Sequence, residues 1–411
     1  MTPRYWTSSL VAVLTACGGA QAARLAPARI DTLPGGVVRV MSDGPTAWSE
    51  QAGVSLLEEQ RFQGEDGTPS ELGDPRSIAV DAAGRIYVAD GKPPAIKVFS
   101  PDGDLIRTIG REGEGPGEFR IGFIALRGEH LVLHDPRLGR TSVFDTAGNF
   151  IRSWHSSCCY WSDIQVDHQD RIYIPSMVAR KAGDSPRGVP YVRWSLDGKE
   201  LDTLWVPPRE SGKYWTVSFK RGGKNVMMMS TTIPFMPLLT HALHPDGGFV
   251  YGWTGEYTMV RSATGQDSAR IFGRAWTPDP VSDQRRKSEV ETKIKEVGEN
   301  YDQATVRSAF RLQDVPATLP AYLNLRVDQG GRVWVRRWTV ADTGKTWFDL
   351  FDSTGVYLGP VSVPFKLAEW GNQAWTSNGL VTAIEDAEGR PTIVRLRLGA
   401  AGEASDRKTR H

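Results

Sequence analysis

The chain has 411 residues, and its 49 Lys and Arg side chains nearly balance its 48 Asp and Glu side chains. This balance excludes an overall field that would attract nucleic acid or an anionic membrane surface, so a partner must be recognised locally. Hydrophobic residues make up 40% of the chain, and its 43 Gly and 26 Pro indicate many turns. This composition favours many short strands over long helices.

A targeting segment opens the chain. Arg4 gives it a positive start, and the apolar run Leu10 to Ala16 is far shorter than the ~20 residues of a membrane span. The run ends in Leu14-Thr15-Ala16-Cys17-Gly18, which resembles the bacterial lipobox. The resemblance implies that residues 1–16 are a lipoprotein signal peptide and that Cys17 carries a lipid anchor.

Cleavage after Ala20-Gln21-Ala22, an A-x-A site, is the alternative. Both outcomes predict export. Lipidation would tether the protein to the cell envelope, at the outer membrane because Gly18 is not the aspartate that retains many lipoproteins at the inner membrane. Cleavage at the A-x-A site would leave it soluble in the periplasm or secreted. Residues 17–47 begin with an Ala-, Pro- and Gly-rich stretch and predict a flexible spacer.

A unit of four short strands recurs between residues 48 and 400. In Pro75–Asp90, two alternating strands flank a turn that contains Asp81 and Gly84, and strands at Ile96–Phe99 and Leu105–Ile109 follow. Similar units, the early ones roughly 40 to 45 residues apart, start near Ile124, Ile164, Ala242, Leu325 and Leu380. The pattern predicts an all-β fold, a six-bladed β-propeller of four-stranded antiparallel blades.

Two insertions interrupt the repeat, and a tail follows it. Residues 207–238 contain Val226–Met229 without an Asp-x-x-Gly turn, which favours a hairpin over a seventh blade. In residues 278–312, Ser282 is a candidate cap for a helix that runs through Val297. Its apolar stripe predicts that the helix lies against the propeller. Residues 401–411 are expected to be disordered.

The ring must close through both chain ends, because an open propeller would leave an unpaired sheet edge. The sixth unit lacks an obvious fourth strand. The alternating segment Val54–Phe62 precedes the first blade and is the natural donor of that strand.

The repeated units resemble NHL-type repeats. The segment Gly110–Phe119 is also similar to the loop after the first blade in many bacterial six-bladed propeller lipoproteins. The resemblance covers roughly Trp48 to Leu398. Propellers of this kind include binding scaffolds, lyases and lactonases, so the fold does not select a function. Within the segment, Gly113 to Phe119 is expected to be a structural turn, with Phe119 inserted between neighbouring blades.

Adjacent cysteines stand at Cys158 and Cys159. Their α-carbons are ~3.8 Å apart across a trans peptide, whereas disulfides prefer ~4.4 to 6.8 Å, so a bridge would be strained. A vicinal disulfide and a pair of free thiols remain alternatives. The neighbouring Tyr160 and Trp161, together with Asp163 and His241, are candidates for binding at the channel or on one face; packing between blades is the alternative for the two aromatic residues.

Enzymatic propellers place carboxylates, Asn and His around the channel to hold a divalent metal. The available candidates are Asp90, Asp135, Asp163, His134 and His241. Asp90 and Asp135 occupy equivalent repeat positions, which favours a role in capping turns. The chain has no HExxH, GxSxG or P-loop pattern, so no catalytic residue, metal ligand or cofactor is predicted.

We therefore expect a non-catalytic, envelope-anchored binding or scaffold propeller that recognises a protein, peptide or glycan. Aromatic-rich loops near Tyr160-Trp161 and Tyr214-Trp215 are the candidate contact regions. The alternative is a metal-dependent hydrolase or lyase of the lactonase or amidating-lyase type, which would use the channel to hold a divalent metal, with Ca²⁺ as the candidate. A sensor-like input domain is a third interpretation and would require a signalling partner.

Overall fold

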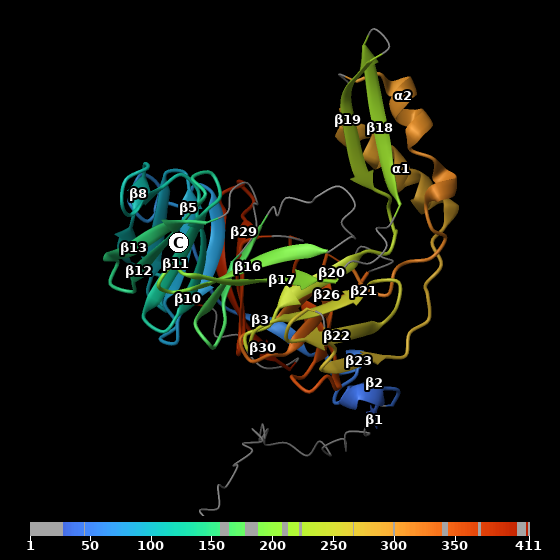
Figure 1. Cartoon of the computed structure of the whole chain (residues 1–411), viewed down its shortest axis with the longest axis horizontal. Helices are drawn as coiled ribbons and strands as arrows, with labels where there is room; N and C mark the ends of the chain where they lie inside the picture. The colour runs from blue at the N-terminus through green and yellow to red at the C-terminus, as the bar shows by residue number, and fades with distance from the viewer. Residues whose placement is uncertain are drawn as a thin grey trace, which may run out of the picture.

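The computed structural model describes residues 28–44, 46–156, 164–176, 188–207, 213–221, 224–265, 267–298, 301–338, 344–368, 371–400 and 408–409. These residues form a nearly all-β body from which a smaller lobe projects (Figure 1). None of the described helices is long and apolar enough to cross a membrane. Several predictions concern residues outside these ranges, namely the signal peptide with its two cleavage sites, the lipid on Cys17, and Cys158, Cys159, Tyr160, Trp161 and Asp163.

The first three repeat units are separate four-stranded antiparallel sheets whose strands follow chain order, as the sequence predicts. The first contains β4 (Pro75–Val80), β5 (Ile86–Gly91), β6 (Pro94–Phe99) and β7 (Leu105–Ile109). The second contains β10 (Phe123–Arg127), β11 (His130–Asp135), β12 (Arg140–Asp145) and β13 (Phe150–His155). The third contains β14 (Gln165–Val166), β15 (Arg171–Pro175), β16 (Val189–Ser195) and β17 (Glu200–Val206).

The next unit is extended by the N-terminal segment. Its strands are β20 (Leu239–Leu243), β21 (Phe249–Trp253), β22 (Thr258–Ser262) and β23 (Arg270–Arg274), and the added strands are β2 (Val38–Ser42) and β1 (Arg29–Thr32). β2 pairs in parallel with β23. The predicted flexible spacer is therefore wrong over Arg29–Ser42. Val40 is buried in a core cluster with Met259 and Phe272, so this short segment buries apolar surface by joining the sheet edge.

The last two units contain β24 (Asn324–Val327), β25 (Val333–Arg336), β26 (Thr346–Phe351) and β27 (Tyr357–Val363), then β28 (Gln373–Thr376), β29 (Gly379–Glu385) and β30 (Pro391–Gly399). β28 was not recognised in the sequence. The missing fourth strand is β3 (Ser55–Phe62), which pairs antiparallel with β30, so the prediction that Val54–Phe62 supplies this strand is confirmed. One bridge between Ser55 and Ser362 joins these two units in a single sheet.

Short elements complete the body. The 3₁₀ turns are η1 (Pro34–Gly36), η2 (Glu50–Ala52) and η3 (Leu312–Asp314), and β31 (Lys408–Thr409) pairs with β3. The prediction of a disordered tail is therefore wrong for residues 408–409. They form a strand because β3 has backbone groups at its edge that can pair with them.

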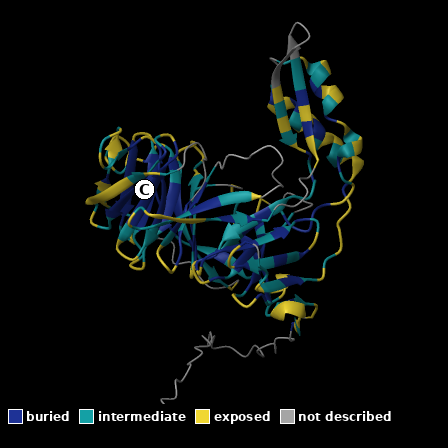
Figure 2. Ribbon diagram, viewed as in Figure 1, coloured by how far each residue is buried: buried dark blue, intermediate teal, exposed yellow. Residues whose placement is uncertain are grey.

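The cores lie between neighbouring sheets, and Figure 2 shows buried residues along the strands of the body. The loop after β7 contains β8 (Arg111–Glu112) and β9 (Glu118–Phe119), which pair in parallel. Phe119 is buried in a cluster that combines Ile96 and Ile109 of the first unit with Leu133 and Phe144 of the second. The expected insertion of Phe119 between neighbouring units is confirmed.

The two insertions build the projecting lobe together. It contains the hairpin of β18 (Tyr214–Arg221) and β19 (Lys224–Thr232), and the helices α1 (Asp283–Val297) and α2 (Gln303–Ala309). The predicted helix is present and is capped by Ser282, whose side chain accepts the backbone N–H of Arg285. α2 was not predicted.

The lobe has its own hydrophobic core. Val290, Ile294 and Val297 of α1 share a buried cluster with Trp215 and Val217 of β18. The expectation that the helix lies against the propeller is wrong, because the inner face of the hairpin supplies the apolar surface that the helix stripe needs. The expected contact loop at Tyr214-Trp215 is also wrong, because both residues belong to strand β18 and Trp215 is buried.

Candidate binding site

An aspartate holds the turn between the first two strands of several units. Asp81 accepts the backbone N–H groups of Ala83 and Arg85 at 3.0 and 2.9 Å and pairs with Nε of Arg85 at 2.6 Å. Asp167 and Asp328 make the same set of bonds in their own turns. Such side-chain-to-backbone bonds fix the turn geometry, so all these turns lie at the same end of their units.

A second series of aspartates lies where the second strands end. Asp90 accepts the backbone N–H groups of Gly73 and Asp74 at 3.0 and 2.7 Å. Asp135 accepts those of Arg120 and Arg137 at 2.7 and 2.9 Å. The predicted capping role of Asp90 and Asp135 is confirmed, because their oxygens accept backbone N–H groups of the connecting segments; Asp90 also forms a buried ion pair with Lys97 at 2.8 Å.

A cavity with a volume of about 510 Å³ lies among the first strands of the units. Residues of β4, β10, β14, β24 and β28 form its wall, and Pro245 contributes from the turn after β20. The turn residues Asp81, Ala82, His168 and Gln329 also line it, so the cavity opens at the end where the aspartate turns lie. We refer to it as the turn-end cavity.

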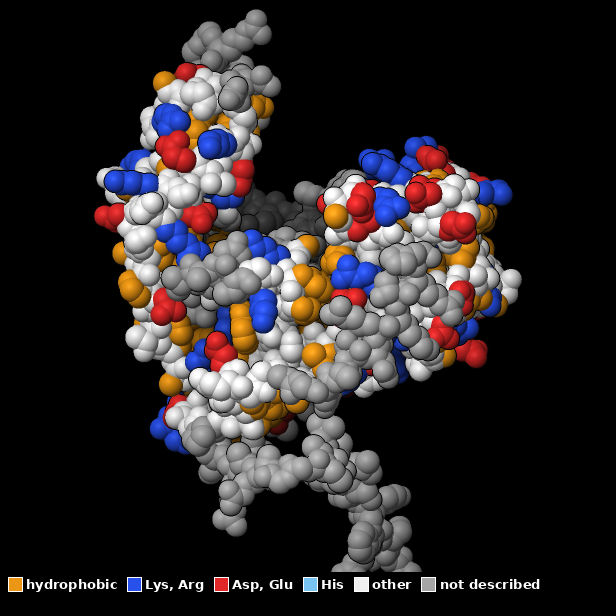
Figure 3. All heavy atoms as spheres, turned by 180° about the vertical axis from the view of Figure 1, so that it is seen from behind, with side chains coloured by type: hydrophobic (Ala, Val, Ile, Leu, Met, Phe, Trp, Pro, Cys, Tyr) orange, Lys and Arg blue, Asp and Glu red, His pale blue; other side chains and the backbone are white. Residues whose placement is uncertain are grey.

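Charged side chains at the rim of the turn-end cavity are paired across neighbouring units. Arg127 donates to the Asp170 carboxylate at 3.0 Å and to the His168 carbonyl oxygen at 2.7 Å. Nδ1 of His168 lies 2.8 Å from a carboxylate oxygen of Asp246. These pairs compensate the rim charges. Figure 3 likewise shows Lys and Arg mixed with Asp and Glu on the face that it displays.

The polar groups of the wall are mainly neutral. The side-chain amides of Gln165 and Gln329 line the cavity and have no hydrogen-bond partner among the residues that the structure describes. The first strand of each unit is also the inner edge of its sheet, where alternate backbone N–H and C=O groups have no neighbouring strand. Some backbone groups of the wall bond to the next unit instead, as the Ile124 N–H does to the Ser77 hydroxyl and the Trp375 carbonyl does to the Gln329 N–H. The cavity can therefore bind a ligand through neutral donors and acceptors.

The two predicted histidines lie outside this cavity. Burial lowers the pKa of His241 to about 4, and its Nε2 lies 2.9 Å from the Tyr191 hydroxyl. Burial also lowers the pKa of His134 to about 4, and its Nδ1 lies 3.1 Å from the Thr141 hydroxyl. His134 is fully buried, and His241 is partly buried. Across the described ranges, no three His, Cys, Asp or Glu side chains converge as they would around a metal ion.

Sequence reasoning found the strands that surround the turn-end cavity but not the cavity itself. Ser77, Ile124 and Val327 are far apart in the sequence, and nothing in one sequence shows that they share a wall. The repeat supplied the usable signal, because the first strands of equivalent units face a common axis in a propeller.

No protein-family model matches the chain, and no curated protein has a significant match to it. A solved structure from the DUF4221 family of Bacteroides vulgatus is 12% identical, with 85% of this chain and 100% of that chain covered and a TM-score of 0.48. A protein from Bacteroides fragilis is 13% identical, with 88% and 98% covered and a TM-score of 0.44.

Virginiamycin B lyase from Staphylococcus aureus is 13% identical, with 83% of this chain and 99% of that chain covered and a TM-score of 0.41. These low values do not assign the chain to a family or to an activity.

Proposed function

We propose that the chain is an exported, non-catalytic binding protein built as a closed ring of six four-stranded units. Hydrogen bonds join each unit to the next, which supports closure. The donors and acceptors are Ile124 N–H to Ser77, Arg127 to Asp170, His168 to Asp246, Arg274 to Asp349, Arg332 to the Ser377 carbonyl, and Arg395 to the Gly84 carbonyl. The last pair returns to the first unit.

Export and lipid anchoring through Cys17 are part of the proposal. They are supported by the short apolar N-terminal run and the lipobox-like Leu14–Gly18. Mass spectrometry of the protein from native membranes tests them. Acylated Cys17 as the first residue is the expected result, and an unmodified chain that starts after Ala22 would contradict anchoring.

We propose that the turn-end cavity binds an extended polypeptide segment of a partner protein. The composition of the cavity wall supports this proposal. The inner strand edges present backbone donors and acceptors beside the side-chain amides of Gln165 and Gln329. An extended peptide matches such edges by adding main-chain hydrogen bonds, as in β-strand addition. The paired rim charges favour a segment without a high net charge.

The experiment selects peptides from a randomised library on the full-length protein and measures the affinity of the selected peptide. Ala82 lines the cavity at the turn, so Ala82→Trp should obstruct the cavity and weaken binding by at least about tenfold, or about 1.4 kcal/mol. Ala83→Trp is the matched control, because Ala83 is exposed in the same turn and does not line the cavity.

Equal affinities of the Ala82→Trp and Ala83→Trp variants would place the peptide elsewhere and contradict the proposal. A second outcome would also contradict the peptide proposal. If no peptide is selected, and neutral oligosaccharides bind to the parent protein but not to Ala82→Trp, the ligand of the cavity is a glycan.

A further inference from the structure

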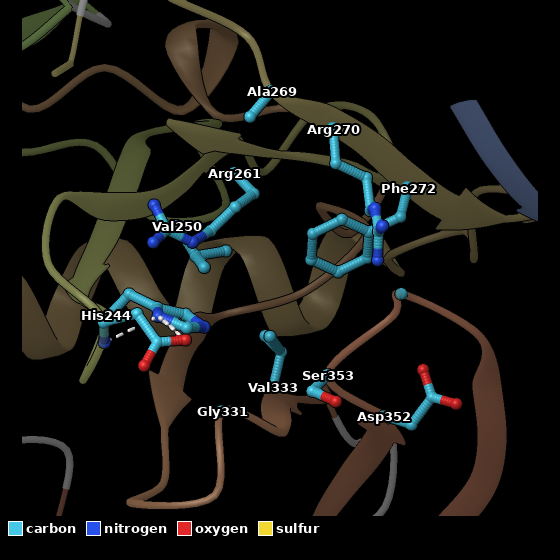
Figure 4. Close-up of a pocket in the computed structure, with 12 residues that line it drawn as sticks. His244, Val250, Arg261, Ala269, Arg270, Phe272, Gly331, Val333, Asp352 and Ser353 are labelled. Carbon is cyan, nitrogen blue, oxygen red and sulfur yellow. Dashed lines mark hydrogen bonds and ion pairs between the residues drawn. The ribbon is translucent and has the colours of Figure 1, made fainter. Parts of the chain in front are cut away.

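A second cavity lies between the β20–β23 and β24–β27 units and has a volume of about 220 Å³ (Figure 4). Val250, Phe272 and Val333 provide buried apolar surface in its lining. The polar side chains that line it are His244, Asp246, Arg261, Arg270, Asp352 and Ser353. We refer to it as the inter-unit cavity.

The inter-unit cavity lies beside a turn that lacks the aspartate–arginine pair. In the first, third and fifth units the first residue of this turn is an aspartate that pairs with an arginine four positions later, as Asp167 does with Arg171 and Asp328 with Arg332. The corresponding residues of the β20–β21 turn are His244 and Gly248. A single neutral imidazole and a glycine thus replace an ion pair, which removes a bulky guanidinium from this position.

His244 presents a hydrogen-bond donor to the cavity. Its Nδ1 accepts the backbone N–H of Asp246 at 3.1 Å, which assigns the ring proton of the neutral form to Nε2. His244 is only 7% exposed, and burial lowers its pKa to about 4, so the ring is neutral at pH 7. Nε2 faces the neighbouring unit, where a Cβ on Gly331 would lie 3.2 Å from it.

Two arginines line the same space, and neither forms an ion pair with a carboxylate among the described residues. Arg261 donates to the carbonyl oxygens of Ser262 and Gly247 at 2.5 and 2.6 Å. Burial lowers the pKa of Arg261, and the charges of the nearby Asp246 and Asp267 offset part of this effect. In the view of Figure 4 the Phe272 ring lies between the two arginine side chains. Part of each guanidinium therefore remains available to a ligand.

The nearby carboxylates are occupied or only partly available. Asp246 is paired with His168 at 2.8 Å. One oxygen of Asp352 accepts the backbone N–H groups of Thr354 and Val356, both at 2.9 Å. The cavity thus offers more unpaired positive than negative charge to a ligand. The apolar part of its lining is formed by Val250, Phe272 and Val333.

We propose that the inter-unit cavity binds a small organic carboxylate through Arg261, Arg270 and Nε2–H of His244. Guanidinium groups recognise carboxylates by paired, charge-assisted hydrogen bonds. The apolar part of the lining suits a short carbon chain. The volume is below the roughly 300 to 1,000 Å³ of pockets for drug-sized molecules, which limits the ligand to a few heavy atoms.

The test is calorimetric titration of the full-length protein at pH 7 with acetate, succinate and alanine, with inorganic phosphate as the competing anion. Saturable binding of at least one carboxylate is expected. Arg270→Gln should weaken it by about tenfold or more, as expected for loss of a charge-assisted hydrogen-bond donor. Ser353→Phe should abolish binding by filling the cavity from its exposed side. Arg152→Gln is the control, because exposed Arg152 lies on β13.

Unchanged melting temperatures would show that the variants fold. Absence of binding at millimolar carboxylate would overturn the proposal, as would binding of phosphate alone or equal affinities of the parent, Arg270→Gln and Ser353→Phe proteins. Ala82→Trp obstructs only the turn-end cavity and should leave carboxylate binding unchanged, so the two proposals can fail separately.

Discussion

The indole of Trp215 in β18 stacks on the ring of Phe310, which follows α2, with ring centroids 4.8 Å apart and planes at 14°. The two residues come from different insertions, and the stack lies in the core of the lobe. Because this core contains residues of the hairpin and of α1, neither insertion buries its apolar side chains alone. The lobe is therefore expected to lose its structure as one unit when its core is damaged.

Replacing Trp215 tests this dependence. Trp215→Ala should destabilise the lobe by about 3 to 5 kcal/mol, the usual cost of truncating a buried Trp. Because the strands of the body have separate cores, the helical signal in circular dichroism should be lost at lower urea than the strand signal. Tyr214→Ala is the control, since the Tyr214 side chain is exposed. A single unshifted transition in both variants would contradict an independent lobe core.

Closure through β3 predicts a large effect at Leu56. Leu56 is fully buried in a cluster with Leu350 and Leu396, so Leu56→Ala should lower the free energy of unfolding of the body by about 2 to 5 kcal/mol. Leu57 points to the other face of β3 and is only partly buried. Leu57→Ala should therefore cost less, and urea denaturation of both variants measures the difference. Equal losses would argue against a buried closing strand.

A buried carboxylate links the β20–β23 and β24–β27 units. Asp349 accepts hydrogen bonds from the hydroxyls of Tyr257 and Tyr357 and from the guanidinium groups of Arg274 and Arg337, the last two at 2.9 and 2.8 Å. Burial alone would raise the pKa of Asp349, but Arg337 and Arg274 outweigh it and hold the pKa below its usual value.

This network predicts an acid-dependent loss of stability. Asp349→Asn should cost about 3 kcal/mol at pH 7, because it leaves the partly buried guanidinium groups of Arg274 and Arg337 without their carboxylate. The pKa of Asp349 is lower in the folded protein than in the unfolded chain, where it is about 3.9. The ionised carboxylate therefore stabilises the fold above that pH, and this stability is lost as the pH falls through the folded-state pKa. Urea denaturation from pH 7 to pH 2 should show the parent and Asp349→Asn proteins converging below about pH 4. A difference in the free energy of unfolding that stays constant with pH would contradict the ionised state of Asp349. Asp283→Asn is the control, because the Asp283 side chain is exposed.

Three histidines with a lowered pKa predict a separate loss of stability at milder acidity. Burial lowers the pKa of His134, His241 and His244 from 6.5 to about 4. The unfolded chain binds their protons more readily, so the associated stability is complete above pH 6.5 and falls as the pH drops toward 4. Each histidine should contribute about 1.4 kcal/mol per pH unit in this window.

Urea denaturation at pH 7, 6 and 5 measures this slope. His134→Gln should reduce the slope by the contribution of one histidine, whereas replacement of exposed His155 should leave it as in the parent. An unchanged slope in His134→Gln would show that His134 does not stay neutral in the folded protein.

The sequence predicts those features that depend on neighbouring residues. Alternation in Val54–Phe62 and the turn chemistry of Asp81 and Asp328 indicate strands and hairpins, and Ser282 marks the start of α1, because each of these signals acts over a few residues. β1 and β2 were missed because a Pro- and Gly-containing segment resembles a linker, although Val38 and Val40 alternate as in a strand.

Contacts between segments that are distant in the sequence could not be predicted from such local signals. The stack of Trp215 on Phe310 and the meeting of His244 with Gly331 depend on how whole units are arranged. The replacement of the turn aspartate by His244 was nevertheless visible. Aligning the turns residue by residue would have shown that the β20–β21 turn has His244 where three other turns have an aspartate.

Hydrogen exchange with a selected peptide tests most directly whether the turn-end cavity is the binding site. The peptide is expected to slow exchange at the first strands β4, β10, β24 and β28; Ala82→Trp should remove this protection, and Ala83→Trp should keep it. Protection confined to the outer strands or to the β18–β19 hairpin, with no change at the first strands, would contradict binding at the turn-end cavity.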